Sequence, residues 1–223
     1  MKDCRLSPVR FKLLILLFLY TSFVEAETDV DSVGVALDIA SYKSDWQFDS
    51  GVREAKITSI SFQLEEKLEA GLTVGGGIGY FDMTVRGNSS ASAQDFDGQY
   101  LEIYMRHPFP VSERISIHGA FAYRYYSGNG HNGGEREDID WNEVNLQIGV
   151  GVRFAHLRVT PFAAYYNVDG DISDDNSTGS FENDDSVSQG VSLDYFVDNT
   201  AFIRLEIRSG YQSGGRISFE RRY

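Results

Sequence analysis

Apolar and polar residues alternate along most of the chain, most clearly over its last stretch, residues 201–223. There, aliphatic or aromatic residues take every second position and charged residues lie between them, on both sides of a glycine-rich turn at residues 212–215. Successive side chains of a β-strand point to opposite faces, so a period of two indicates a strand rather than a helix. This stretch is predicted to form two strands, each with one apolar and one charged face.

Ten segments of this kind follow one another, and none shows a helical period. They begin near Val33, Thr58, Leu72, Leu101, Ile115, Val144, Arg158, Val191, Ala201 and Ile217. The pattern predicts an all-β, antiparallel barrel or sandwich with ten strands. The segment at 158–168 is the least regular, so eight strands remain the alternative if a weak segment is a loop. A length of about ten residues matches a tilted membrane strand of ~9–11 residues.

The links between the segments alternate in length. Long or polar links are expected at 44–54, 86–97, 127–140 and 169–186, and short ones at 66–70, 107–113, 155–157 and 197–200. Short turns on one side and long loops on the other are typical of an up-and-down membrane barrel. An even number of strands then places both ends of the barrel on the short-turn side, which would be the periplasm.

The N-terminal segment has the features of a secretory signal peptide. Four basic residues precede an apolar run at 13–24, and small residues allow cleavage after Ala26. The run is shorter than the ~20 residues of a spanning helix, which is the alternative. We therefore expect a signal peptide at 1–26 and a barrel domain at 27–223.

Composition narrows the function of the mature chain. Cys4 is the only cysteine, so residues 27–223 contain none. Removing the signal takes away four basic and two acidic residues, which leaves 16 basic and 31 acidic residues and a formal charge of −15. Such an excess of negative charge argues against nucleic acid as a partner.

Aromatic residues favour a membrane barrel over a secreted sandwich. One set is expected near the long-loop ends and another near the short turns, as in the two interfacial belts of a membrane protein. The first set is Tyr42, Trp46, Tyr123, Tyr125, Tyr126, Trp141, Tyr165 and Tyr166. The second set is Phe62, Phe109, Phe154, Tyr195, Phe196 and Tyr223.

Together, the signal, the alternating strands, the turn at 197–200 and the terminal aromatic residue resemble the small outer-membrane β-barrels of Gram-negative bacteria, of the OmpA, OmpX and opacity-protein type. The resemblance covers the whole mature chain and implies a porin-like, monomeric barrel in contact with outer-membrane lipid and lipopolysaccharide. It also implies that the barrel-assembly machinery reads the last strand through Gly215, Ile217, Phe219 and Tyr223. A structural or surface-interaction function is expected, with a surface ligand held by acidic loops.

The polar face of the strands carries charges of both signs, which are expected to point into the barrel. They are Asp38, Glu65, Glu102, Arg106, Arg124, Glu143, Arg153, Arg204, Glu206, Arg208, Glu220 and Arg222. Side chains nearly fill a barrel of 8–10 strands, so these charges are predicted to form ion pairs across it. The alternative is a narrow channel for a small solute. Glycines at 75–79 would make room for large inward side chains of neighbouring strands.

Enzyme chemistry is not expected, and no cofactor is implied. His118 is the only histidine predicted to face the interior from mid-strand, and His131 with Asp138 or Asp140 is the nearest approach to the rim of a membrane protease. Neither set supplies a nucleophile, a base and an orienting group together. An outer-membrane lipid-modifying enzyme or protease is the third alternative, after the channel.

The link at 169–186 contains seven acidic residues and no lysine or arginine. Within it, Asp171, Ser173, Asp175 and Glu182 have the spacing of a twelve-residue calcium loop, together with Ser177 and Gly179. Asn176 stands where that loop needs glycine, and the flanking segments are predicted strands instead of helices. A solvated acidic loop is the simpler interpretation.

Overall fold

The computed structural model describes residues 33–68, 71–87, 93–132, 135–173 and 177–223, so the predicted signal peptide lies outside it. In these ranges the chain is all-β. Its strands are β1 (Val33–Phe48), β2 (Gly51–Lys67), β3 (Thr73–Gly87), β4 (Gln94–Pro110), β5 (Ile115–Asn132), β6 (Glu135–Phe154), β7 (Leu157–Ser173), β8 (Thr178–Asn183), β9 (Val187–Phe196), β10 (Ala201–Gly210) and β11 (Ser213–Arg222). No helix in the described residues is long and apolar enough to cross a membrane.

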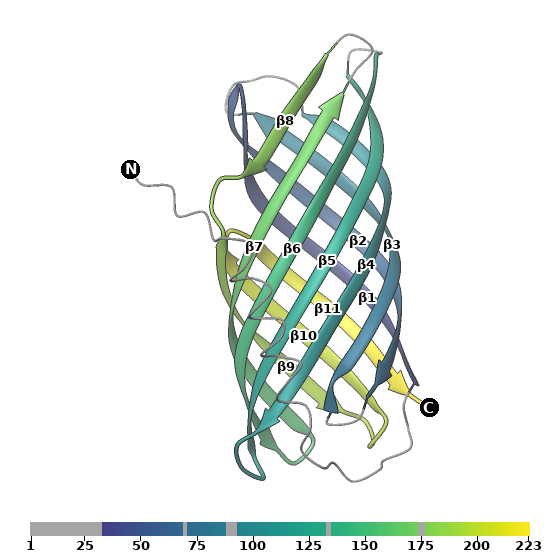
Figure 1. The fold of residues 1–223 in the computed structure, drawn as a ribbon, viewed down its shortest axis with the longest axis vertical. Coiled ribbons are helices and arrows are strands. Elements are labelled where there is room, and N and C mark those ends of the chain that lie inside the picture. Colours follow the sequence, from purple (N-terminus) through teal and green to yellow (C-terminus); the bar gives the residue numbers. More distant parts are fainter. Residues whose placement is uncertain (1–32, 69–70, 88–92, 133–134, 174–176) are drawn as a thin grey trace, which may run out of the picture.

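Ten of the strands form a closed antiparallel ring (Figure 1). Strands β1–β7 pair in chain order, β7 pairs with β9, and β9–β11 follow. The ring closes where Leu37 of β1 lies opposite Phe219 of β11, while Leu37 also lies opposite Phe62 of β2. The prediction of an antiparallel barrel with a ten-stranded ring is confirmed.

Strand β8 was not predicted, and it corrects the interpretation of 169–186 as a loop. It pairs with β7 through Asp171 and Ser180, and with β1 through Gln47 and Glu182. It lies at the end of the barrel opposite the C-terminus (Figure 1). There it takes the place of β9–β11 between β7 and β1, so β1–β8 form a second ring of eight strands. Fewer strands enclose a narrower interior.

Strand lengths divide the barrel into two parts. Strands β9, β10 and β11 have 10 residues each, while β6 has 20. At about 3.4 Å per residue and a tilt of about 40°, ten residues stand roughly 26 Å tall and twenty roughly 52 Å, against an apolar band of ~25 Å in outer-membrane barrels. The short strands match such a band, and the long strands continue beyond it. We call the part around β8 the extension, and the part around β9–β11 the terminal half.

The predicted long links at 44–54, 86–97 and 127–140 are therefore wrong in large part. Strand β1 ends at Phe48 and β2 begins at Gly51, and β5 and β6 extend to Asn132 and from Glu135. The polar residues of these links are the water-facing side of strands, and their period of two is preserved.

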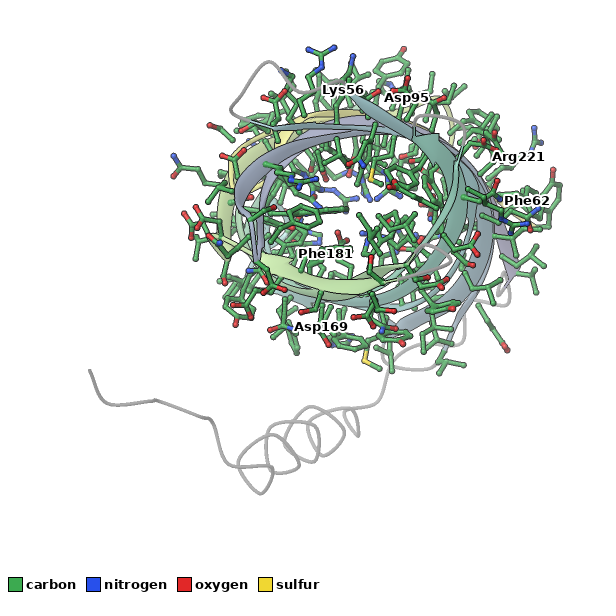
Figure 2. All side chains as sticks on the ribbon, turned by 90° about the horizontal axis from the view of Figure 1, so that it is seen from above. Lys56, Phe62, Asp95, Asp169, Phe181 and Arg221 are labelled. Carbon is green, nitrogen blue, oxygen red and sulfur yellow. The ribbon has the colours of Figure 1, made fainter. Side chains whose placement is uncertain are left out.

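Polarity inverts along each long strand. On β1 the outward residues change from Leu37 and Ile39 to Lys43 and Asp45, while the inward residues change from Asp38 to Trp46 and Phe48. Figure 2 shows Lys56, Asp95 and Asp169 pointing away from the ring and Phe181 pointing into it. The terminal half thus has an apolar exterior and a charged interior, whereas the extension is built like a water-soluble barrel.

Large apolar side chains fill the extension. We call this cluster the aromatic core: Trp46, Phe48, Ala55, Phe81, Met83, Val85, Phe96, Tyr100, Tyr126, Ile139, Trp141, Phe162, Ala164, Tyr166, Val168, Phe181 and Tyr211. Ring centroids are 4.2 Å apart between Tyr126 and Trp141, and 4.6 Å apart between Trp46 and Phe181. Such stacked aromatic pairs add to the stabilisation from burial alone.

The aromatic core corrects the predicted interfacial belt near the long loops. Trp46, Tyr126, Trp141 and Tyr166 are buried inside the barrel, and the Arg208 guanidinium lies 4.6 Å from the centre of the Tyr42 ring. The sequence prediction assigned these rings to the lipid–water interface because they lie near the predicted long loops, and it did not anticipate that the inward face becomes apolar there. Tyr125 and Tyr165 of the same set do lie on the exterior.

Candidate functional site in the barrel interior and on the extension

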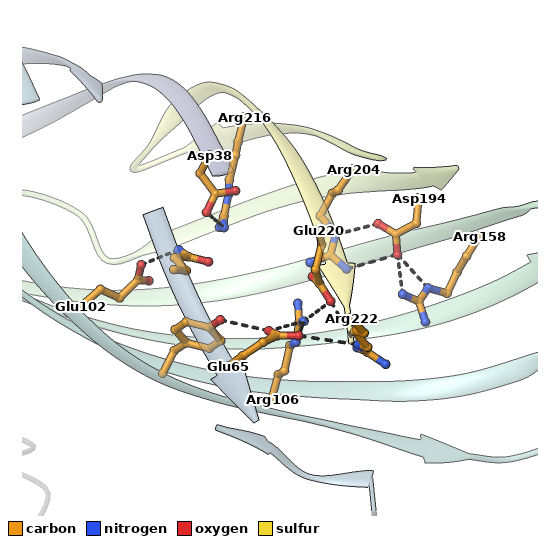
Figure 3. A network of polar contacts seen from close by, with 12 residues as sticks. Asp38, Glu65, Glu102, Arg106, Arg158, Asp194, Arg204, Arg216, Glu220 and Arg222 are labelled. Atoms are coloured by element: carbon orange, nitrogen blue, oxygen red, sulfur yellow. Dashed lines mark hydrogen bonds and ion pairs between the residues drawn. The ribbon is translucent and has the colours of Figure 1, made fainter. Parts of the chain in front are cut away.

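Ion pairs fill the interior of the terminal half, and Asp194 of β9 lies at the centre of one group (Figure 3). Arg158 Nη2 is 2.5 Å from Asp194 Oδ2, and Arg204 Nε is 2.6 Å from Oδ1. The Asp194 side chain is 1% exposed, while each arginine side chain is about a fifth exposed. One carboxylate thus holds two guanidinium groups that also reach water.

A second group surrounds Arg106 of β4. Its Nη2 lies 2.6 Å from Glu65 of β2 and 2.6 Å from Glu220 of β11, so it connects strands across the barrel (Figure 3). Tyr104 donates a hydrogen bond of 3.0 Å to Glu65, and Arg222 Nη2 lies 3.2 Å from Glu220. Each buried carboxylate therefore has the partners that burial of a charge requires.

A third group lies nearer the extension. Arg124 bridges Glu102 at 2.7 Å and Glu143 at 2.5 Å. Arg216 pairs with Asp38 at 2.7 Å, and Arg208 pairs with Glu206. These groups link β1, β4, β5, β6, β10 and β11.

The β10–β11 turn joins the charged interior to the aromatic core. Tyr211 and Gln212 are buried, and Trp46 Nε1 donates to Tyr211 Oη over 3.0 Å. Gln212 Nε2 donates to Glu143 over 2.8 Å. Gly210 has φ +113°, a conformation that glycine adopts without strain. The side chains of this tight turn are therefore buried in the barrel, where Tyr211 contacts the aromatic core and Gln212 contacts the charged interior.

The structure places eleven of the twelve predicted interior charges in these ion pairs: Asp38, Glu65, Glu102, Arg106, Arg124, Glu143, Arg204, Glu206, Arg208, Glu220 and Arg222. Arg153 is the exception, because it is exposed at the end of β6 with its guanidinium 4.8 Å from the Phe196 ring centre.

Three network members were missed: Arg158, Asp194 and Arg216. Arg158 falls in the least regular segment, where the inward face was left open. Arg216 lies between the predicted turn and the segment that begins near Ile217 and was assigned to neither, although it shares the parity of Glu220 and Arg222. Parity could have identified Arg216 and Asp194. Nothing in the local pattern identifies Arg158.

Two glycines of β3 make room for inward tyrosines of β4, as expected. A Cβ at Gly75 would lie 2.4 Å from the Tyr104 ring, and one at Gly79 would lie 2.2 Å from the Tyr100 ring. Real Cβ atoms do not approach so closely. Glycine at these positions lets large side chains lie flat against the wall of a narrow barrel.

Among the predicted histidine candidates, His118 has a hydroxyl partner. His118 Nε2 lies 2.7 Å from Ser116 Oγ on the inner face of β5. The side chain of His131 lies outside the described residues, and Asp140 accepts a hydrogen bond of 3.2 Å from Tyr125 on the exterior. The absence of an enzyme function stays an expectation.

The calcium-loop candidates lie on a paired hairpin. Asp171 and Ser173 belong to β7 and Glu182 to β8, where Glu182 lies opposite Asp169. Asp175 lies outside the described residues. In the part of the chain that the structure describes, no group of three or more His, Cys, Asp or Glu side chains converges as a metal site would require.

The residues of the predicted assembly signal lie on β11 or directly after it. Ile217, Phe219 and Tyr223 are exposed on the exterior, and the Tyr223 amide donates to Val33 O over 2.8 Å. Gly215 lies opposite Ser41 at the seam between β11 and β1. Their recognition by an assembly machinery stays a prediction.

The short turn at 197–200 is organised by Asp198. Its Oδ1 accepts hydrogen bonds from the amides of Thr200 and Ala201, each over 2.7 Å, and from Thr200 Oγ1 over 2.9 Å. These donors stabilise the carboxylate and lower the pKa of Asp198 below its usual value. The turn therefore fixes the connection between β9 and β10.

The exterior of the extension carries an acidic face over β6, β7, β8 and the link from β8 to β9. We define it by Asp138, Asp140, Asp169, Asp171, Glu182, Asp184 and Asp185. Asp140 lies directly opposite Asp171, and Asp169 lies directly opposite Glu182. Arg136 pairs with Asp138 over 2.9 Å. By contrast, the exterior of β1 and β2 carries the exposed ion pair of Lys43 with Glu54.

No family model and no curated protein sequence matches the chain. Among solved structures, it is similar to the outer-membrane protease OmpT from Escherichia coli, with a TM-score of 0.52, 9% identity and coverage of 90% of this chain and 97% of that one. It is also similar to the translocator domain of autotransporter NalP from Neisseria meningitidis (TM-score 0.48, 15% identity, 96% of each chain) and to neisserial surface protein A (TM-score 0.41, 13% identity, 71% of this chain and 94% of that one). The closed ring, the apolar exterior of its terminal half and the likeness to OmpT together show that this chain has the fold of a Gram-negative outer-membrane β-barrel.

Proposed function

We propose that this chain is an outer-membrane barrel with a surface-interaction function. In this proposal the terminal half spans the membrane and holds the rigid, water-exposed extension outside the cell. The inversion of polarity along the long strands carries this proposal. A chain whose only task is to span the membrane needs an apolar exterior throughout. Here seven strands continue beyond the apolar band and enclose an aromatic core of their own.

The acidic face supports an interaction with a positively charged partner. Like charges directly opposite each other on a sheet are destabilising by up to about 1 kcal/mol per pair. Two such pairs, Asp140 with Asp171 and Asp169 with Glu182, lie side by side on the acidic face. The opposite wall also has two, Asp45 with Glu54 and Asp82 with Asp97, but there Lys43 and Arg86 lie beside Glu54. The uncompensated charge of the acidic face favours attraction of a cationic surface. The rigid core holds the face in a fixed geometry.

Binding of a fluorescent oligolysine peptide to the barrel in lipid vesicles tests this function. Neutralising the four central acids, as Asp140→Asn, Asp169→Asn, Asp171→Asn and Glu182→Gln, should weaken binding about tenfold at low salt. The control neutralises four exterior acids of the opposite wall, Glu54, Asp82, Asp95 and Asp97, and should weaken binding by about threefold or less. Equal losses for the two sets would contradict a dedicated face, because only net charge would then matter.

The side chains that fill the barrel argue against the channel alternative, which predicts ion conductance. A solute would have to pass both the ion-pair groups and the aromatic core, in which Trp46, Phe81 and Trp141 are at most 1% exposed. We expect the barrel to give no stepwise conductance in planar lipid bilayers. Insertion is verified in the same preparation by a shift of migration between boiled and unboiled samples. Regular conductance steps would contradict the expectation that side chains block the barrel interior.

A further inference from the structure

A polar cavity of about 140 Å³ opens at the terminal end of the barrel. Its lining includes residues from the ends of strands: Lys67 of β2, Arg158 of β7, Phe202 of β10 and Arg222 of β11, together with Gly71 of the β2–β3 turn. Residues beside the short turns therefore form its mouth. Members of the ion-pair groups line the cavity, and the strand ends that form it lie at the end of the barrel opposite β8 (Figure 1).

Positive charge dominates the cavity wall. Lys67, Arg106, Arg158, Arg204 and Arg222 all line it. The carboxylates that pair with these arginines are Glu65, Asp194 and Glu220. Five cationic groups thus face three carboxylates. Glu206 also lines the cavity, but its charge is matched by Arg208. Among the residues that the structure describes, an excess of two positive charges remains in a partly enclosed space.

Within the described residues, one of these two charges is that of Lys67, and the other comes from the two arginines that share Asp194. Arg158 uses Nε and Nη2 on a single oxygen of Asp194, and Arg204 uses Nε and Nη2 on the same carboxylate (Figure 3). Two forks therefore share one anion. A barrel that only needed internal packing would balance each guanidinium with a carboxylate, because burying unmatched charge is costly. A second anion between the forks would restore the balance.

We propose that this cavity binds a phosphate-type oxyanion. Planar guanidinium forks match the oxygens of a phosphate group, and a site with several of them is selective for it. Thr160 and Ser192 of the lining add hydroxyl donors. The volume holds several water molecules, so a tetrahedral ion of five atoms fits. The source is either free phosphate or the headgroup of a phospholipid in the adjacent leaflet. This inference does not rest on the proposed surface function.

Thermal unfolding of the full barrel in a neutral detergent tests the site, because a ligand of the folded state raises the unfolding temperature. Inorganic phosphate should raise it relative to chloride at equal ionic strength, and Arg158→Gln should weaken the apparent affinity at least about tenfold, as loss of a charged hydrogen-bond partner does. This variant leaves Asp194 paired with Arg204, so the fold is preserved. The matched control is Arg153→Gln, which removes an exposed arginine at the same end that does not line the cavity.

Short-chain phosphatidic acid and phosphatidylcholine form the second arm. The proposal is supported if phosphate and phosphatidic acid both raise the unfolding temperature, and if this rise is lost in Arg158→Gln and kept in Arg153→Gln. Free phosphate is then a sufficient ligand. A response to phosphatidic acid alone, with the same dependence on Arg158, supports the proposal with the lipid as source. The absence of any response, a response equal for chloride or phosphatidylcholine, or a response unchanged in Arg158→Gln would overturn the proposal.

Discussion

Asp194→Asn should lower the free energy of unfolding of the barrel by about 3 kcal/mol, because removing one partner of a buried ion pair leaves the other charges unmatched. Asp194 is the single carboxylate between Arg158 and Arg204, and its side chain is 1% exposed. Asparagine keeps the shape and loses the charge. Reversible unfolding in urea, followed in lipid vesicles by intrinsic fluorescence, measures the change.

The control and the reversal of this effect separate charge from packing. Glu66→Gln removes an exposed carboxylate of β2 on the exterior and should change the free energy of unfolding by less than about 0.5 kcal/mol. Adding Arg158→Gln to Asp194→Asn removes one of the two unmatched guanidinium groups, so it should recover about half of the loss, a coupling expected of residues in direct contact. An Asp194→Asn barrel as stable as the original would contradict the assigned ion-pair group.

Trp141→Ala should loosen the extension and leave the terminal half folded. Trp141 is 1% exposed, stacks on Tyr126, and lies edge-on to Trp46 and Phe81. Truncating such a side chain costs about 3–5 kcal/mol in a packed core. Trp46 is then the only tryptophan of the chain, so its fluorescence should shift to the red as water enters. Limited proteolysis should cut the extension, while the migration shift between boiled and unboiled samples persists.

A matched aromatic on the exterior gives the control for this prediction. Tyr165→Ala removes a ring that is 46% exposed on β7, next to the buried Tyr166. It should leave both the tryptophan emission and the protease resistance unchanged. Trp141→Phe should retain most of the stability, because the indole N–H has no hydrogen-bond partner among the described residues. Loss of the migration shift in Trp141→Ala would contradict two separately packed parts.

Sequence patterning predicts the barrel ring well because period two is a property of the backbone. The outward apolar residues of β10 and β11, such as Leu205 and Phe219, lie on the exterior with adjacent charges inside. The same rule failed for the extension. Along β1, alternation continues from Leu37 to Trp46, but the environments of the two faces are exchanged. Period alone does not say which face meets water, so polar residues on strands were interpreted as loops.

The candidate site was predictable only in part. Charges at inward positions follow from parity, but their partners depend on strand stagger, which brings Arg106 of β4 to Glu220 of β11. Strand β8 could not be recognised, because its acidic exterior and short length are equally typical of a loop. The positive charge of the cavity at the terminal end depends on how many arginines share each carboxylate. No local sequence pattern carries that information.

The central claim is that the barrel has an apolar exterior in its terminal half and a water-exposed exterior on the extension. An environment-sensitive fluorophore, attached to single cysteines introduced into the mature chain, measures this directly in lipid vesicles with quencher-labelled lipid. Probes at Phe62, Ile78 and Leu205 should emit as in hydrocarbon and be quenched by the lipid. Probes at Lys56, Asp95 and Asp169, which point outward from the extension (Figure 2), should emit as in water and escape quenching. Lipid-like emission and quenching at these three positions would contradict the account.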